Sequence, residues 1–159
     1  MATDATGYIV ASNEGSAWDG GPGWAGRPTT FKLLSNRTGG KFAVFESVVP
    51  PGTGTPLHVH HTSDEVAYIL SGEFTVRLGE ETKHASAGAW IFIPRASVHG
   101  WRNSGAEQGR AFFLFAPGLG AAAFEEMGLM GMPPQEIDPA IRDAMFARAG
   151  FELIAMDWK

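Results

Sequence analysis

Residues 52–72 read GTGTPLHVHHTSDEVAYILSG and contain three side chains that chemistry can use together, His58, His60 and Glu65. Side chains two residues apart on a β-strand point to the same side, so His58 and His60 project together. Glu65 follows the short polar turn 62–64, at the start of the next β-rich run. The stretch therefore predicts two short strands that carry two imidazoles and one carboxylate.

A second stretch, residues 88–103, reads GAWIFIPRASVHGWRN and supplies His99 from a distant strand. Imidazole and carboxylate without sulfur suit Fe, Mn, Co, Ni, Cu or Zn. A closed structural zinc site usually contains Cys, and this chain has none. We therefore expect one divalent transition metal on His58, His60, Glu65 and His99, with coordination positions left open. The other two histidines, His61 and His84, are expected to lie outside the site.

These two stretches resemble the two cupin motifs. The first motif is matched at each signature position, namely Gly52, His58, His60, Glu65 and Gly72, and the second from Gly88 through Pro94 and His99 to Asn103. The second match departs at Ala96, where the family usually has Gly, the residue suited to a tight turn. The resemblance implies an all-β fold, a cupin jelly-roll β-barrel with one metal ion.

The rest of the chain divides by composition into an arm, a barrel and an appendage, which we expect to form one domain over 1–159. Residues 1–30 are rich in turn-formers and predict an irregular arm held by Trp18 and Trp24. Residues 31–116 alternate short β-rich runs with turns, as antiparallel barrels do. The runs are 31–34, 42–49, 57–61, 65–70, 73–78, 90–93, 99–103 and 111–115.

The segment 117–159 predicts a helical appendage. Residues 121–127 are helical in pattern, and Asp138 before Pro139 is a favourable helix start. Ile141, Met145 and Phe146 fall on one face of the second helix, Gly150 would end it, and 151–156 would return as an extended segment. We expect the appendage to pack on the barrel or to lie at the contact of a homodimer.

Composition excludes several classes of function. The chain has 159 residues, 44% of them hydrophobic, a net charge of −5 and no Cys, so disulfides and thiolate sites are ruled out. No segment concentrates Lys and Arg, which argues against nucleic acid and anionic membranes as partners. With neither a signal-peptide pattern nor an apolar run of about 20 residues, we expect a cytoplasmic protein that binds a small molecule.

Within the cupins, the chain most resembles bacterial quercetin 2,3-dioxygenase-like proteins, in segments 30–34, 40–46, 124–134 and 149–153. That resemblance implies an oxidoreductase that uses dioxygen on an aromatic or enol substrate such as a flavonol. Glu65 would then be catalytic as well as a ligand, because it would take the proton of the substrate hydroxyl. Four aromatic residues either line the pocket or fill the barrel core: Phe92, Trp101, Phe113 and Phe115.

Two other readings remain open. A metal-dependent isomerase, lyase or decarboxylase would use the ion as a Lewis acid. A phosphorylated sugar would then need pocket cations, for which the candidates are Lys32, Arg77, Arg95 and Arg102. A non-enzymatic binding module is the third reading, because one fold serves many functions.

Overall fold

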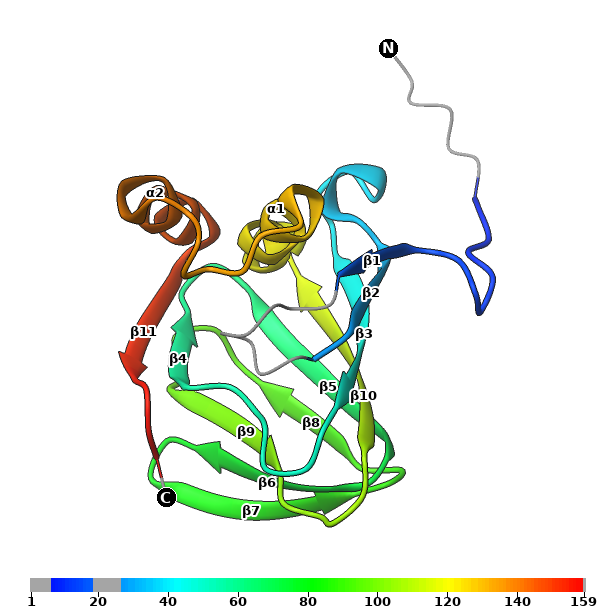
Figure 1. Ribbon diagram of the computed structural model, residues 1–159, viewed down its shortest axis with the longest axis vertical. Helices are drawn as coiled ribbons and strands as arrows, with labels where there is room; N and C mark the ends of the chain where they lie inside the picture. Colours follow the sequence, from blue (N-terminus) through cyan, green and yellow to red (C-terminus); the bar gives the residue numbers. More distant parts are fainter. Residues whose placement is uncertain (1–6, 19–26, 159) are drawn as a thin grey trace.

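The computed structural model describes residues 7–18 and 27–158, and within them two β-sheets face each other as a jelly-roll barrel (Figure 1). One sheet has six strands in the order β1 (Ser16–Trp18), β2 (Thr29–Leu33), β3 (Ala43–Val49), β10 (Gly109–Ala116), β5 (Asp64–Ser71) and β8 (Trp90–Ile93). The other has five, in the order β11 (Phe151–Ala155), β4 (Leu57–His60), β9 (His99–Asn103), β6 (Glu73–Leu78) and β7 (Glu81–Ser86). The all-β barrel expected from the sequence is confirmed.

Alternation along the strands decides which residues enter the barrel. On β5, Ala67 and Ile69 are buried, and on β10, Phe113 and Phe115 are buried, whereas their sequence neighbours lie closer to solvent. Strands β5 and β10 pair antiparallel with Phe113 opposite Ala67, so these inward side chains form one layer. The site residues Glu65 on β5 and His60 on β4 also occupy inward-facing positions of their strands.

Two strands differ from the expectation. β7 was missed because its sequence, ETKHAS, has no apolar alternation; it is an edge strand that pairs only with β6 among the described strands, and its side chains are mostly exposed. The arm contributes the short strand β1, which pairs antiparallel with β2. Trp24, expected to hold the arm in place, lies outside the described residues.

The appendage forms two helices, α1 (Ala122–Met130) and α2 (Pro139–Ala149), followed by β11. Asp138 begins α2 as expected, because its Oδ1 accepts hydrogen bonds from the backbone N–H groups of Ala140 at 2.9 Å and Ile141 at 3.3 Å. Gly150 ends it with a left-handed φ of 67°. β11 then pairs with β4, the strand that carries His58 and His60. The appendage therefore supports the site strand directly.

The expected apolar face of α2 is divided between core and solvent. Met145 is fully buried and the Phe146 ring lies 4.8 Å from that of Phe151, so both pack on the barrel. Ile141 is 54% exposed. The α2 face is thus largely packed within the chain, which is the first of the two alternatives expected for the appendage.

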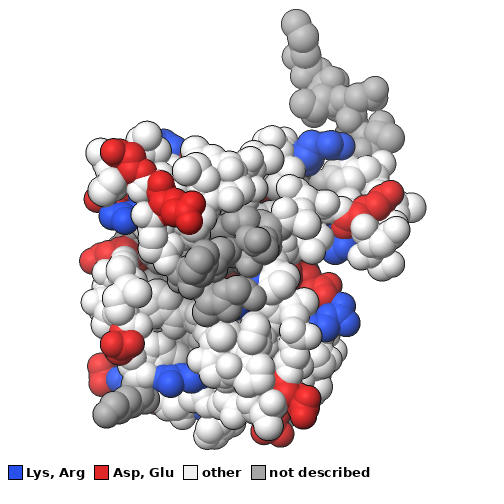
Figure 2. All heavy atoms as spheres, in the orientation of Figure 1, with Lys and Arg blue, Asp and Glu red and all other residues white. Residues whose placement is uncertain are grey.

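Charge is spread over the surface. On the face in Figure 2, basic side chains stand among acidic ones without a patch of one sign. Neither described α-helix is long and apolar enough to cross a membrane.

Candidate metal centre

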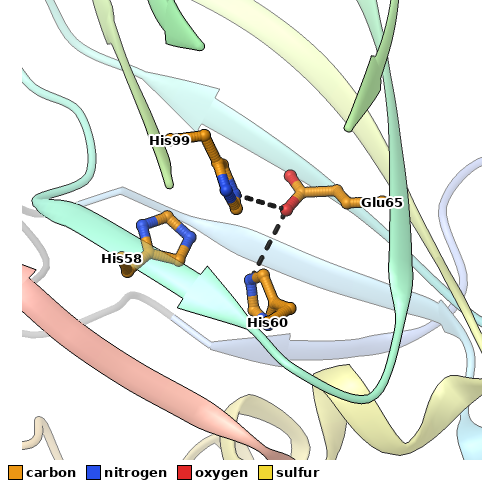
Figure 3. A group of neighbouring side chains, drawn as sticks. All are labelled: His58, His60, Glu65 and His99. Carbon is orange, nitrogen blue, oxygen red and sulfur yellow. Dashed lines mark hydrogen bonds and ion pairs between the residues drawn. The ribbon is translucent and has the colours of Figure 1, made fainter. Parts of the chain in front are cut away.

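The four predicted ligands meet inside the barrel at one place (Figure 3). His58 and His60 come from β4, Glu65 from β5 and His99 from β9, and each can offer one ligand atom such that all these atoms lie within 4.8 Å of one another. His58 is opposite His99 in the β4–β9 pairing, and the two rings are 4.2 Å apart. All four side chains are buried.

Backbone carbonyls orient two of the imidazoles. Nδ1 of His58 donates to the carbonyl of Pro56 at 2.8 Å, and Nδ1 of His99 donates to that of Ser97 at 3.0 Å. A carbonyl can only accept, so in both rings Nδ1 carries the hydrogen. Nε2 of His58 is then the unprotonated nitrogen, and Nε2 of His99 lies 3.0 Å from Oε2 of Glu65. Fixing the ring through Nδ1 is the usual support of a metal-binding histidine.

His60 provides the strongest indication that the cluster suits an ion. Neither of its ring nitrogens makes a hydrogen bond within the described residues, although Nε2 lies 3.5 Å from Oε2 of Glu65. Buried polar atoms are nearly always hydrogen-bonded, and each exception calls for an explanation such as an ion or a water. With imidazole and carboxylate donors converging, the cluster is compatible with a divalent metal.

The pKa shifts follow from burial and from Glu65. Burial lowers the pKa of His60 to about 4 despite the opposing charge of Glu65, and burial with the neighbouring histidines lowers that of His58 well below its usual value. Both rings are therefore neutral at pH 7. Burial acts to raise the pKa of Glu65, but the hydrogen bond and charge of His99 outweigh it and the net shift is downward. Burial likewise acts to lower the pKa of His99, but Glu65 overcomes it and the pKa rises. Glu65 is a carboxylate at neutral pH.

The turn between β4 and β5 is fixed by the appendage. Ser63 is buried; its hydroxyl donates to the carbonyl of Pro117 at 2.7 Å and accepts from the N–H of Gly120 at 2.9 Å. The hydroxyl of Thr62 donates to the carbonyl of Ala149 at 3.0 Å. These bonds anchor the turn that joins His60 to Glu65, and they could not be predicted from the motif alone.

A second connection joins the two motif loops. The carboxylate of Asp64 accepts three hydrogen bonds from Arg95. The donors are Nε at 3.1 Å, Nη2 at 3.0 Å and the backbone N–H of Arg95 at 2.9 Å. These hydrogen bonds with Arg95 hold the pKa of Asp64 at about 2. Ala96, next in the loop, has a φ of 63°, and its N–H donates to the carbonyl of His60 at 2.8 Å. The chain keeps the turn that glycine would favour even though alanine occupies it.

The remaining histidines lie elsewhere, as expected. His61 is 51% exposed, and its Nε2 lies 2.6 Å from Oε2 of Glu152. His84 is exposed on the edge strand β7.

An inner cavity of about 40 Å³ adjoins the cluster. Its lining includes Trp101, Phe113 and Phe115, as predicted by the interpretation that these aromatic residues line the pocket. Phe92 does not, because its strand parity turns it outward and leaves it 63% exposed. The residues that sequence reasoning missed are Arg27, Thr29, Phe31, Phe45, Ser47, Thr55, Pro56, Phe124 and Phe151.

A larger outer groove of about 550 Å³ lies between the barrel and α2. It shares three lining residues with the inner cavity, Arg27, Pro56 and Phe151. Its other walls include Phe146 and Arg142 of α2 and Leu153 of β11. The shared walls show that the inner cavity adjoins a groove of ligand-binding size.

The cation in the cavity wall is not one of the four that the sequence suggested. Lys32 donates to the carbonyls of Ala11, Ser12 and Glu14, and Arg95 binds Asp64. Arg77 donates to the carbonyl of Gly79, and Arg102 lies over the ring of Trp158. Arg27 lines the cavity instead. Its alternation with Thr29 and Phe31, which also line the cavity, was the signal that could have identified it.

Comparison with known proteins identifies the family. The profile of the cupin domain matches residues 45–115. An uncharacterized protein of Methanocaldococcus jannaschii is 39% identical over 67 residues, which cover 42% of this chain and 54% of that protein. Protein SchB of Streptomyces halstedii is 32% identical over 87 residues, which cover 54% of this chain and 63% of that protein. The chain thus spans less than two thirds of the length of either relative.

Among solved structures, a protein of Thermotoga maritima described as a predicted oxalate decarboxylase superimposes with a TM-score of 0.62. It is 22% identical, and the match covers 69% of this chain and 99% of that one, which shows a shared fold. The segment that matches the cupin-domain profile, residues 45–115, begins in β3, ends in β10 and contains all four residues of the cluster. From the family match and the jelly-roll arrangement, we conclude that residues 45–115 are a cupin domain.

Proposed function

We propose that the chain is a metal-dependent enzyme that holds one divalent transition-metal ion on His58, His60, Glu65 and His99. The observation that carries this proposal is the buried cluster, in which His60 makes no hydrogen bond within the described residues. A buried carboxylate beside three imidazoles needs a cation or protons to offset its lost hydration. The donor set suits Fe, Mn, Co, Ni, Cu or Zn and does not choose among them.

The reaction we propose is a dioxygenation of a small aromatic or enol substrate such as a flavonol. When bound, the ion would supply Lewis acidity and, for a redox-active metal, a partner for dioxygen. Glu65 takes the proton of the substrate hydroxyl, for which it is suited as a carboxylate at neutral pH. Both atoms of dioxygen enter the product, so no separate reductant is required.

The shape and lining of the two spaces support an aromatic substrate with a reactive oxygen at one end. The inner cavity, at about 40 Å³, admits only a small group. The outer groove, at about 550 Å³, can hold the body of a flavonol-sized molecule. Phe45, Phe113 and Phe115 form the apolar wall beside the cluster. They would exclude water from the group that Glu65 deprotonates.

The test begins with elemental analysis of protein purified without chelator, followed by an oxygen-consumption screen over flavonols and diketones. We expect about one metal ion per chain and turnover that stops without dioxygen, with labelled oxygen in the product. Glu65→Gln should lower the rate about 10²–10⁴-fold, the usual contribution of a general base, while retaining more metal than His99→Ala. Equal activity in Glu65→Gln would contradict the proposed role of Glu65 as a base.

A non-oxidative lyase, isomerase or decarboxylase is the second candidate. The observation that favours it is Arg27 in the cavity wall, because a guanidinium suits an anionic substrate. Undiminished turnover under strict exclusion of oxygen would reject dioxygenation and support this candidate. Saturable binding without turnover would indicate a binding protein instead.

We also propose that the chain forms a homodimer through the outer apolar face of the six-stranded sheet. Its residues are Val66, Tyr68, Leu70, Trp90, Phe92, Phe112 and Leu114, which the strand pairings of β10, β5 and β8 place side by side. Trp90 is 68% exposed, and its ring lies 4.4 Å from that of Tyr68. A sheet face of this composition is poorly suited to water and suits a second copy related by a two-fold axis.

Light scattering tests the homodimer. We expect a dimer mass at micromolar concentration for the unchanged chain and a monomer mass for Phe92→Glu. Ile141→Glu on α2, which is 54% exposed, is the matched control and should leave the dimer intact. A monomer mass for the unchanged chain would contradict the proposal.

A further inference from the structure

Trp158 follows β11 and packs against β9, the strand that carries His99. Its indole Nε1–H donates to the carbonyl of Thr55 at 2.9 Å. The Cζ of Arg102, on β9, lies over the indole ring at 4.3 Å from its centre, and Arg102 also donates a hydrogen bond to the backbone carbonyl of Trp158. These contacts fix the indole in one orientation.

The carbonyl that Trp158 binds belongs to a segment with little freedom of its own. The backbone N–H of Thr55 donates to the carbonyl of Trp101 at 2.8 Å, and its Oγ1 accepts from the N–H of Trp101 at 3.1 Å. Pro56 follows, and its ring fixes φ at about −65°. Because Thr55 is held by Trp101 and the φ of Pro56 is fixed, the direction of the Thr55 carbonyl strongly limits the direction of the next carbonyl, that of Pro56.

The Pro56 carbonyl orients one of the proposed metal ligands. It accepts a hydrogen bond from Nδ1 of His58 at 2.8 Å, which leaves Nε2 as the nitrogen that can bind an ion. Partners of this kind commonly tune a metal site from outside its ligands. Contacts therefore connect the indole of Trp158, through the peptide units of Thr55 and Pro56, to the imidazole of His58.

Gly100 shows how closely these groups approach one another. It lies between His99 and Trp101 on β9, and a Cβ placed there would be 3.0 Å from the carbonyl oxygen of Pro56 and 3.0 Å from Nε1 of Trp158. Its φ is not in the left-handed region, so the backbone conformation does not require glycine. The missing side chain instead makes room for the indole and for the carbonyl that orients His58.

We infer that Trp158 is a positioning residue of the metal centre, which holds the Thr55–Pro56 segment so that the Pro56 carbonyl keeps His58 in its metal-binding orientation. This rests on the proposed function, because the ion is part of that proposal. Trp158 is not among the described residues that line the inner cavity or the outer groove. Its effect on the centre is therefore exerted through other residues and not through contact with a substrate.

The first experiment measures the affinity for Zn²⁺ and the visible absorption of bound Co²⁺ in Trp158→Phe. Phenylalanine keeps a ring beside Arg102 but lacks the N–H that binds Thr55. We expect about 3–10-fold weaker Zn²⁺ binding, at or below the usual effect of losing a direct partner of a ligand. The Co²⁺ absorption should shift, because it responds to the orientation of His58. Asp157→Asn, an adjacent exposed position, is the matched control and should change neither quantity.

Gly100→Ala tests the same arrangement from β9. The added methyl group meets both the Pro56 carbonyl and the indole, so it should also weaken Zn²⁺ binding by about 3–10-fold. Because both substitutions disturb one contact, the double variant with Trp158→Phe should bind about as weakly as the weaker single variant. Fully additive losses would mean that the two residues act independently, and would overturn the inference. If Trp158→Phe fails to fold, Gly100→Ala alone decides.

A third measurement needs no metal and separates this inference from the proposed function. NMR of the metal-free protein gives the exchange rate of the Nδ1–H hydrogen of His58, which Trp158→Phe should increase and Asp157→Asn should not. Unchanged protein that binds no Zn²⁺ would contradict the metal-dependent enzyme, while the exchange rate would still decide the role of Trp158. A lower melting temperature of Trp158→Phe with unchanged Zn²⁺ affinity, Co²⁺ absorption and exchange would show a structural role only, and would overturn the inference.

Discussion

The interior of the barrel has two halves that meet at Trp101 and Phe113. One half, which we name the apolar half, consists of Ala67, Ile69, Phe74, Val76, Ile91, Ile93 and Ala111, and the space left among these side chains is about 10 Å³. The other half contains the metal-centre residues and the inner cavity of about 40 Å³. The same strands, β5 and β9, contribute to both halves.

The difference shows how one barrel separates stability from chemistry. In the apolar half the remaining space of about 10 Å³ is no more than the minimum that one water molecule needs, and no polar side chain lines it among the described residues apart from the indole of Trp101. In the other half the ring nitrogens of His60 are buried without a hydrogen bond within the described residues. Such groups cost free energy unless a ligand compensates. The apolar half therefore stabilises a fold that contains an otherwise unfavourable site.

The largest expected effect is the loss of metal from the variant His60→Ala. The variant loses one of four proposed ligands and keeps His58 as the single imidazole of β4 in the centre, so it should lose stoichiometric metal and all activity. His61→Ala is the matched control, because His61 is adjacent but 51% exposed and should leave both unchanged. Elemental analysis of the two variants decides, and unchanged metal content in His60→Ala would refute the proposed centre.

The next largest effect is expected on the free energy of unfolding, for a substitution in the apolar half. Phe74 is fully buried and lies edge-on to Trp101 at 6.0 Å. Phe74→Ala should lower the free energy of unfolding by about 3–5 kcal/mol because it leaves a cavity. Leu129→Ala, at a site 71% exposed, should cost much less. Denaturant unfolding gives both values.

The metal content of Phe74→Ala tests further whether the two halves are separate. Phe74→Ala should retain its metal wherever it remains folded, since Phe74 does not line the inner cavity. Loss of metal from folded Phe74→Ala would mean that the two halves are coupled rather than separate.

Sequence alone predicted most strands of the barrel and the ligand set, because both depend on short-range pattern. Motif spacing identified the four residues of the cluster. The cavity walls depend on contacts between distant segments and were only partly predicted. Arg27 and Phe151 enter the site from opposite ends of the chain, and no local pattern relates them. β7 was missed because an exposed edge strand needs no apolar face.

Metal removal should have a smaller effect than the loss of a core aromatic. A ligand that binds only the folded state stabilises it by about 2.7 kcal/mol at a hundredfold excess over its dissociation constant. Chelation should therefore lower the melting temperature of the unchanged protein, measured by calorimetry. It should not alter that of His60→Ala, which has no metal to lose. Equal melting temperatures before and after verified stripping would contradict the prediction.

The smallest expected effect tests whether the loop before β9 stores strain. Ala96 is exposed, and its φ of 63° lies in the left-handed region, which costs a non-glycine residue about 1–2 kcal/mol. Glycine would relieve this cost but lose about 0.5–1 kcal/mol of chain entropy. Ala96→Gly should therefore stabilise the protein by about 0.5–1 kcal/mol.

Ala87→Gly is the matched control for Ala96→Gly. Ala87 is also exposed in a turn, but its φ is not positive, so the entropy loss acts alone and the variant should be slightly destabilised. Metal content should be unchanged in both variants, because the hydrogen bond from the N–H of residue 96 to the carbonyl of His60 uses only backbone atoms. If Ala96→Gly is destabilised as much as Ala87→Gly, the loop is not strained. If instead Ala96→Gly gains stability but loses metal, the alanine is needed to hold His60 in place, and stability and the site compete within this loop.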